Sequence, residues 1–352
     1  MMKSIFWSAG FKRTINSWRR VVNNRSAPAQ TIMNLAVAYW ASRCLHVIAE
    51  AGIADVLGDE PQTAAELASK SGMLPGALHR VLRALSSHGV FEFDGERFAH
   101  NDASRALRSD MPGSLRSLAR MMGLKIHWDA YRELGIALKG DRPPIAAVTP
   151  AGLFPYLQAH PEEAQIFHEA MAGKSYAQVT PVARAYDYRG FELIGDIGGG
   201  LGHLLYGVLE QAPKSRGVLF DLPQVVDRAR QHPNPRVTYV GGDFFKDPIP
   251  RCDAYLMMTV LHDWSDDQVV AILSNLKAQA QPASKLLIIE GVVRPQANPD
   301  FVKDLDIEML VMTTGRERTA DEWRAVLARA AFDMLRIIPV TPWSSIIEAQ
   351  PR

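Results

Sequence analysis

The chain has 352 residues, of which 47% are hydrophobic and 22% are charged, and this balance is typical of a soluble globular protein. It excludes disordered, collagen-like and disulfide-stabilised classes, and the length fits a large domain with a smaller one, or two comparable domains. Lys and Arg number 39 against 38 Asp and Glu, so the net charge of +1 gives no overall reason to expect a nucleic acid or an acidic membrane as partner.

The cysteine pattern and the longest uncharged stretch suggest where the protein works. Cys44 and Cys252 have no CxxC spacing, which argues against a disulfide framework or a thiolate metal site and fits a reducing cytoplasm. Residues 26–42 are uncharged but contain Pro28, Gln30 and Asn34 and fall short of the roughly 18 to 20 apolar residues of a membrane span. We therefore predict a cytoplasmic location with no stable membrane insertion. No continuous apolar segment follows the basic residues at the start, so no cleavable secretory signal is expected.

Residues 1–27 carry only basic charges, and aromatic and aliphatic side chains recur there at near-helical spacing, among them Phe6, Trp7, Phe11 and Trp18. The segment is predicted to be a basic amphipathic arm. A transit peptide and a membrane-surface helix fit the same pattern, but we favour a helix that packs on a partner subunit.

Residues 28–112 are predicted to form a mainly helical, winged-helix-like domain. Helical patterns cover 37–51, 63–68 and 75–88, and Thr63 with Glu66 forms a capping box. The apolar runs 90–93 and 97–99 flank Asp94-Gly95, which is a hairpin signal. Winged helices often bind DNA, but the helix at 75–88 offers only Arg80, Arg83 and two histidines for phosphate contacts. We therefore expect dimerisation or a pocket wall and no nucleic acid.

Residues 113–190 are predicted to be a helical linker and pocket-lining segment with a loop at 141–144. From 191 to 352 short apolar runs alternate with helical patterns such as 268–281, which indicates an α/β fold with a parallel sheet covered by helices on both faces. The predicted strands are 193–197, 217–220, 237–240, 254–258 and 286–289. Ligands of such sheets bind at the carboxyl ends of the strands.

A glycine-rich turn follows the first of these strands, in the sequence Asp196-Ile-Gly198-Gly-Gly200-Leu-Gly202. Glycines bring backbone N–H groups close to a ligand at the start of the next helix. The dinucleotide fingerprint fails on spacing, because its last Gly would fall on His203. Asp196 would repel phosphates but would favour a cation.

The next two strands also end in acids. Asp221, in Phe-Asp-Leu-Pro, is placed to accept both hydroxyls of a ribose, and Asp243 could accept from an adenine amino group with Phe244 against the ring. A ligand with a ribose, an adenine, a positive centre and no phosphate is S-adenosylmethionine. We predict this cofactor, with S-adenosylhomocysteine as product.

Five motifs in order, D-I-G-G-G-L-G, F-D-L-P, G-G-D-F-F, L-H-D-W-S-D-D and G-R-E-R-T, make the chain resemble the small-molecule O-methyltransferases of the plant caffeic-acid type and their bacterial relatives. The resemblance spans almost the whole chain. It implies a winged-helix dimerisation domain, a class I Rossmann-like methyltransferase domain with a seven-stranded, mainly parallel sheet, and a homodimer formed through the N-terminal domain.

Methyl transfer to a hydroxyl needs a base that removes the proton of the acceptor. The resemblance places this general base at His262 and the carboxylates that orient its ring at Glu290 and Glu317, since a histidine base needs its second nitrogen held by an acceptor. Asp263 is expected to cap the following helix.

The resemblance also implies further contacts. Met171 and Ser175 match the helix that lines the methionine end of the cofactor. Met258 stands where plant relatives often have a Lys near the adenine, which suggests a different arrangement there. The full predicted cofactor set is Asp196, Gly198, Gly200, Asp221, Leu222, Asp243, Phe244, Met258 and Ser175; the predicted acceptor wall is Trp128, Phe167, Met171, Asp306, Met309 and Met312.

The leading hypothesis is therefore an S-adenosylmethionine-dependent methyltransferase that acts on a hydroxyl of a small aromatic or polyketide-like metabolite. One alternative is N-methylation of an aromatic heterocycle such as a phenazine, for which the histidine is not required. Another is a non-catalytic winged-helix regulator that binds S-adenosylmethionine. No His/Cys/Asp cluster with ligand spacing lies near His262, so no metal is expected.

Overall fold

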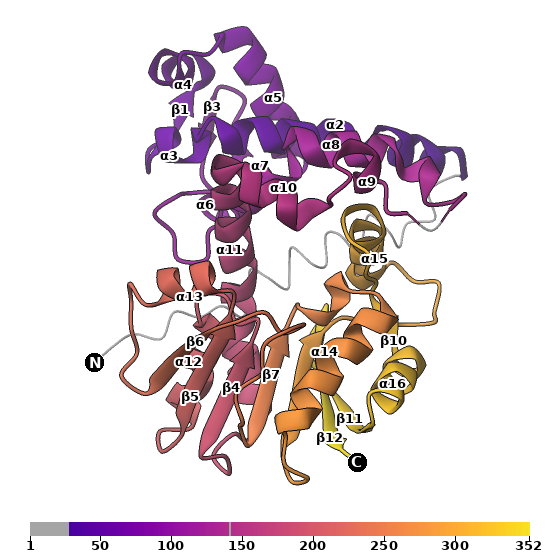
Figure 1. The fold of residues 1–352 in the computed structure, drawn as a ribbon. Helices are drawn as coiled ribbons and strands as arrows, with labels where there is room; N and C mark the ends of the chain where they lie inside the picture. Colours follow the sequence, from indigo (N-terminus) through magenta and orange to yellow (C-terminus); the bar gives the residue numbers. More distant parts are fainter. Residues whose placement is uncertain (1–27, 141) are drawn as a thin grey trace. The chain divides into compact units, whose positions relative to one another are not determined.

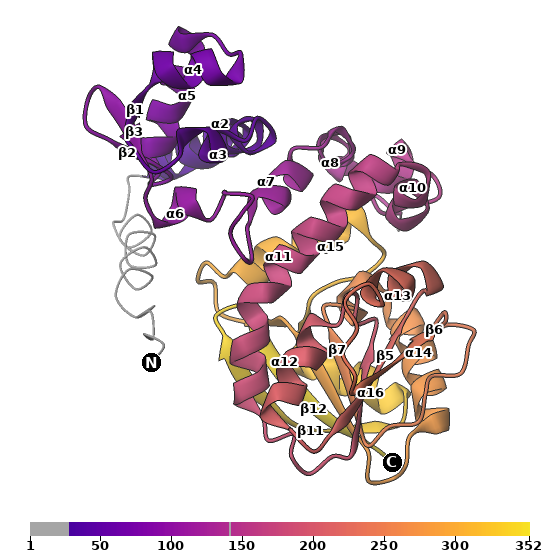
Figure 2. The same cartoon turned by 90° about the vertical axis from the view of Figure 1, so that its left-hand side faces the viewer.

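The computed structural model describes residues 28–140 and 142–352, and the predicted basic arm at 1–27 lies outside the described residues. The chain divides into two compact units, one ending at Gly123 and the other beginning at Leu124 (Figures 1 and 2). The described elements of the first unit are α2 (Pro28–Glu50), α3 (Ile53–Leu57), β1 (Gln62–Thr63), α4 (Ala64–Ser71), α5 (Pro75–Ser87), β2 (Glu92–Phe93), β3 (Arg97–Ala99), α6 (Asp102–Arg105) and α7 (Arg116–Met122).

The first unit contains the predicted helix–helix–wing arrangement. The Thr63 hydroxyl and the Glu66 carboxylate form the predicted capping box at the start of α4. Helix α5 buries Leu78, Leu82 and Leu85, the apolar face that its sequence pattern indicates. Strands β2 and β3 pair antiparallel, and β1 adds a third strand in the order β1-β3-β2. A winged-helix domain is therefore confirmed.

Helix α2 begins well before the predicted start at residue 37 and leaves many large apolar side chains exposed. Ile32, Leu35 and Trp40 are each more than half exposed, and the buried residues lie near its end. Among the described residues, α2 alone has the length and hydropathy of a membrane-crossing helix, a weak indication because core helices and N-terminal signal helices share both properties. The prediction of no span considered only residues 26–42, whereas the helix continues past Arg43 to Glu50.

The second unit begins with helices and continues as an α/β sheet. Its elements are α8 (Lys125–Arg132), the 3₁₀ helix η1 (Leu134–Ile136), α9 (Ile145–Val148), α10 (Leu153–Ala159), α11 (Pro161–Ala185), β4 (Leu193–Ile197), α12 (His203–Gln211), β5 (Arg216–Asp221), α13 (Pro223–Ala229), β6 (Val237–Gly241), β7 (Ala254–Met258), the 3₁₀ helix η2 (Leu261–Asp263), α14 (Asp266–Gln279), β8 (Lys285–Glu290), β9 (Val292–Val293), α15 (Phe301–Met312), β10 (Arg318–Thr319), α16 (Ala320–Arg329), β11 (Phe332–Thr341) and β12 (Ser344–Pro351). The segment predicted as one linker, 113–190, is thus divided, because α7 belongs to the first unit and α8 to α11 to the second.

Seven strands form the main sheet in the order β11-β12-β8-β7-β4-β5-β6 (Figure 1). All neighbours are parallel except β12, which runs antiparallel to both β11 and β8. The predicted seven-stranded, mainly parallel sheet is therefore confirmed. Strand β4 lies between β5 and β7, so the strand order reverses at β4, and in such sheets ligands bind where the order reverses.

Helices cover both faces of this sheet (Figure 2). On one face α11 and α12 contribute Val182, Leu205 and Val208 to a buried cluster. On the other face α14 and α16 contribute Ile272 and Trp323. The two layers hold the parallel strands in register, so the residues that end them, from Ile197 to Glu290, meet at one edge of the sheet.

Candidate active site

The glycine turn after β4 has a backbone that other residues would not tolerate. Gly198 and Gly200 have φ values of +69° and +59°, in the left-handed region. A Cβ at Gly199 would lie 2.5 Å from Cγ of Asp196. Asp221 joins the same turn, because its Oδ2 accepts the Gly200 N–H at 2.8 Å and its Oδ1 accepts the Leu222 N–H at 2.7 Å. Five predicted cofactor residues therefore lie together.

Asp196 is a buried carboxylate beneath this turn. Only 1% of it is exposed, and its Oδ2 has no hydrogen-bond partner within the described residues. Burial raises the pKa of Asp196 to about 7, although the Leu205 N–H acts against the shift. Because an uncompensated buried charge is costly, the position favours a proton or a cationic ligand beside it.

Asp243 and Phe244 follow β6 at the same edge. Asp243 Oδ1 accepts the Phe245 N–H at 2.9 Å, and Lys246 Nζ lies 3.0 Å from Oδ2. The Phe244 ring lies beside Gly198, since a Cβ there would be 3.7 Å from its Cε1, and it meets the edge of Trp264. Phe244 thus borders the glycine turn. The Asp243 side chain is more exposed to solvent and is already paired with Lys246.

The turn after β7 is held by one carboxylate. Thr259 has φ +52°, unusual for a β-branched residue. Glu290 Oε1 accepts three backbone N–H groups there, from Val260 at 3.2 Å, Leu261 at 2.7 Å and His262 at 3.1 Å. The prediction that Glu290 orients the imidazole is therefore wrong in this structure: it fixes the backbone that carries the ring. Burial raises its pKa.

The His262 ring is held by Glu317 instead. Its Nδ1 lies 2.6 Å from Glu317 Oε1, and both side chains are buried. Asp306 Oδ1 accepts the Glu317 N–H at 2.8 Å, so α15 supports this carboxylate. Burial raises the pKa of Glu317 to about 7, and the positive charge of Lys174 acts against the rise. The two predicted residues thus form a buried pair.

Asp263 does not cap the following helix. Ser265 is the N-cap of α14, in a capping box with Gln268. Asp263 instead lies within η2, its Oδ1 3.8 Å from His262 Nε2, and burial raises its pKa to about 6. The prediction for Asp263 failed because Ser265-Asp-Asp-Gln forms a full capping box, which a single Asp does not. Asp263 can therefore face the His262 ring.

The loops that carry His262 and Glu317 are in direct contact. A Cβ at Gly315 would overlap the carbonyl oxygen of His262, so only glycine fits. Arg318 is fully buried, and its Nη2 donates to the Trp264 carbonyl at 2.9 Å while its Nε donates to Asp266. These contacts fix the separation of the pair.

Three helices lie beside this pair. Helix α11 carries Met171, Ser175 and Lys174, and the last was not predicted. Lys174 interacts electrostatically with Glu317, Asp263, Glu308 and Glu290, and burial lowers its pKa. The sequence signal that could have identified Lys174 is its place between Met171 and Ser175, two residues already predicted to line the site.

The predicted acceptor residues lie on α8, α11 and α15. Met312 and Phe167 pack in one apolar cluster with Ile126 of α8, and Met309 is buried. Trp128 is about one-third exposed on α8. Asp306 binds the Glu317 backbone. The three helices therefore lie together, but Phe167 and Met312 pack mainly into the apolar core between them.

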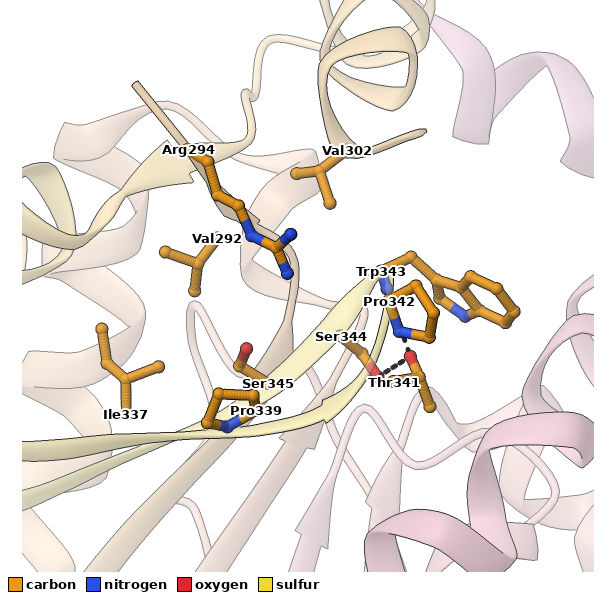
Figure 3. Close-up of a pocket in the computed structure, with 10 residues that line it drawn as sticks. All are labelled: Val292, Arg294, Val302, Ile337, Pro339, Thr341, Pro342, Trp343, Ser344 and Ser345. Carbon is orange, nitrogen blue, oxygen red and sulfur yellow. Dashed lines mark hydrogen bonds between the residues drawn. The ribbon is translucent and has the colours of Figure 1, made fainter. Parts of the chain in front are cut away.

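A separate pocket lies at the tip of the β11–β12 hairpin. Figure 3 shows the Arg294 side chain on one side of it and the Trp343 indole on the other, with Thr341 hydrogen-bonded to Ser344 on the hairpin below them. No predicted site residue lines this pocket. Within residues 28–140 and 142–352 no group of three or more His, Cys, Asp or Glu side chains is arranged to hold a metal ion.

Comparison with known families gives two matches along the chain. Residues 131–333 match the O-methyltransferase domain, and residues 33–110 match the O-methyltransferase dimerisation domain. The chain is 35% identical over 338 residues to the phenazine O-methyltransferase PhzM of Lysobacter antibioticus, covering 94% of this chain and 99% of that protein.

Two further similarities bear on the chemistry. The chain is 32% identical over 335 residues to the 8-amino-8-demethylriboflavin N,N-dimethyltransferase of Streptomyces davaonensis, covering 92% of this chain and 95% of the relative. The SAH-bound structure of a methyltransferase in calicheamicin biosynthesis superposes with a TM-score of 0.83 at 32% identity, covering 93% of this chain and 100% of that one.

The raised pKa of Asp196 predicts how stability changes with pH. A carboxyl whose pKa rises from 3.8 to about 7 on folding favours the folded state fully only below pH 4, and this contribution is lost as pH rises toward 7. We expect Asp196→Asn to raise the melting temperature of the ligand-free protein, and the difference in stability from wild type to grow from pH 5 to pH 7, by roughly 1.4 kcal/mol per pH unit at most, and to level off above pH 7.

Thermal unfolding followed by circular dichroism at several pH values measures this difference. Asp227→Asn, at an exposed position on α13, is the matched control and should shift the melting temperature little at any pH. A pH-independent difference for Asp196→Asn would contradict the expectation.

Proposed function

The chain belongs to the O-methyltransferase family, which uses S-adenosylmethionine, and we propose that it methylates a hydroxyl of a small aromatic or polyketide-like metabolite with His262 as general base. The observation that carries this proposal is the buried pair of His262 Nδ1 and Glu317 Oε1 at 2.6 Å. An ionised Glu317 accepts a hydrogen bond from the Nδ1–H of His262, and this tautomer leaves the lone pair on Nε2. A base of this kind can take the proton of a hydroxyl as the oxygen attacks carbon.

The edge of the sheet fits the cofactor. Asp196 has an unpartnered buried oxygen, the backbone is left-handed at Gly198 and Gly200, and a Cβ at Gly198 would lie 2.9 Å from Cγ2 of Val260. We assign Asp196 and the turn to the methionine end with Ser175, Asp221 to the ribose hydroxyls, and Asp243, Phe244, Leu222 and Met258 to the adenine. When bound, S-adenosylmethionine supplies an electrophilic methyl group. The surrounding residues orient it and exclude water.

The ribose assignment is tested by cofactor binding. Asp221→Ala removes the carboxylate that would accept the ribose hydroxyls and that also holds the Gly200 and Leu222 N–H groups. We expect isothermal titration with S-adenosylmethionine and S-adenosylhomocysteine to show affinity weakened about tenfold or more, because hydrogen bonds to a charged group contribute about 1.5 to 3 kcal/mol each. Asp227→Ala on the adjoining helix is the control. If wild type binds neither compound, the proposed function is wrong.

The base assignment is tested by kinetics and by its pH dependence. His262→Ala should lower kcat roughly 10²- to 10⁴-fold with cofactor affinity unchanged. Because the pKa of Glu317 is raised to about 7, the carboxylate is ionised only above that pH, and we expect wild-type kcat to rise as pH passes through 7. Glu317→Gln should lower kcat and remove this rise. A rise that persists in Glu317→Gln would show that another group titrates.

N-methylation is the second candidate, favoured by the N,N-dimethyltransferase among the similar proteins. Retention of the His262–Glu317 pair favours oxygen, because an aromatic amine does not need prior loss of a proton. Turnover of an arylamine by His262→Ala at the wild-type rate would support nitrogen. A non-catalytic regulator is disfavoured, since the similar proteins are named as enzymes.

The exposed apolar side of α2 suits a homodimer, and residues 33–110 match a dimerisation domain. We propose that α2 lies at the subunit interface. Leu35→Glu with Trp40→Glu should convert a dimeric mass to a monomeric one in light scattering, since two charges would be buried against apolar surface. Arg83→Glu, exposed on α5, is the control. A monomeric wild type would contradict the proposal.

A further inference from the structure

A second buried polar cluster joins α8 to α15. His127 and Tyr131, one helical turn apart on α8, both reach Glu308: His127 Nε2 lies 3.2 Å from Oε1, and the Tyr131 hydroxyl donates to Oε2 at 2.6 Å. The Glu308 side chain is 15% exposed and that of His127 is 6% exposed. None of the three was singled out from the sequence.

This cluster is linked to the reacting pair. Glu308 lies two residues after Asp306, which holds the Glu317 backbone, and directly before Met309. Lys174 on α11 interacts electrostatically with both Glu308 and Glu317. The cluster therefore lies where α8, α11 and α15 meet, next to the predicted acceptor wall.

A contribution to stability does not explain why a carboxylate occupies this buried position. Burial acts to raise the pKa of Glu308, but the His127 ring, the Tyr131 hydroxyl and Lys174 together hold this pKa below its usual value, so the group is ionised. A buried ion pair is seldom more stabilising than packed apolar side chains, which Met309 and Met312 supply next to it. Glu308 Oε1 lies near His127 Nε2 and Oε2 accepts the Tyr131 hydroxyl, so both oxygens can accept a further hydrogen bond. His127 Nδ1 is buried with no partner among the described residues.

We propose that Glu308 determines specificity for the acceptor by accepting a hydrogen bond from a second N–H or O–H group on it. The inference rests on the proposed function and narrows its substrate class to amino- or hydroxy-substituted phenols that carry no carboxylate. Glu308 itself supplies the reason for the exclusion: its carboxylate is ionised, and the nearby cation Lys174 already interacts with Glu308 and Glu317. An added carboxylate on the acceptor would be repelled.

Three naphthalene probes of similar shape test this: 2,3-dihydroxynaphthalene, 3-amino-2-naphthol and 3-hydroxy-2-naphthoate. They are titrated into protein saturated with S-adenosylhomocysteine. Wild type should bind the diol and the aminonaphthol at least about tenfold more tightly than the naphthoate. Glu308→Gln keeps the size of the side chain but loses its charge, and it should reduce this preference about tenfold with S-adenosylhomocysteine affinity unchanged.

Asp304→Asn, exposed on the same helix, is the matched control and should leave the preference intact. Equal binding of the naphthoate by wild type, binding of none of the three probes, or an unchanged preference in Glu308→Gln would each overturn the proposal. Failure to bind S-adenosylhomocysteine would instead reject the proposed function, so the two failures are distinguishable.

Discussion

The candidate active site depends on a single carboxylate oxygen that accepts three backbone N–H groups. Glu290 Oε1 binds the turn after β7, where Thr259 has a positive φ angle that is unfavourable for a β-branched residue. This carboxylate therefore fixes the position of the backbone that carries His262. Each buried N–H left without a partner costs about 1 to 3 kcal/mol, so the turn needs this acceptor. Glu290 ends a central strand, which makes its position as rigid as the sheet.

Much of the architecture follows from the sequence, because burial on both faces leaves a continuous apolar run for each parallel strand. Strands β4 and β7 have the predicted bounds, and the acids Asp196 and Asp221 meet because parallel strands end at one edge. The β11–β12 hairpin could not be predicted in this way. Its strands contain register shifts and Pro339, and β11 has exposed positions without a regular alternation.

The sequence was a poorer guide to which side chains bond to one another in the site. The sequence indicates that Glu290 ends a strand but not whether its oxygens meet the ring or the backbone of His262, and only the tertiary structure decides this. Glu317, 55 residues beyond His262, was recognised through resemblance rather than spacing. Lys174 and Glu308 were missed because a charged residue on a helix is usually solvated, and nothing local shows that three helices enclose these two.

The absence of a side chain at Gly315 has a consequence for how such a site can change. The loop bearing Glu317 lies so close to the His262 carbonyl that neither loop can move without the other, so variation at either position would disturb both. His127 and Tyr131 of α8, in the proposed acceptor wall, take no part in that contact. Changes on α8 therefore leave the contact between the two loops intact, whereas changes at Asp306 of α15 would also reach Glu317, whose N–H it accepts.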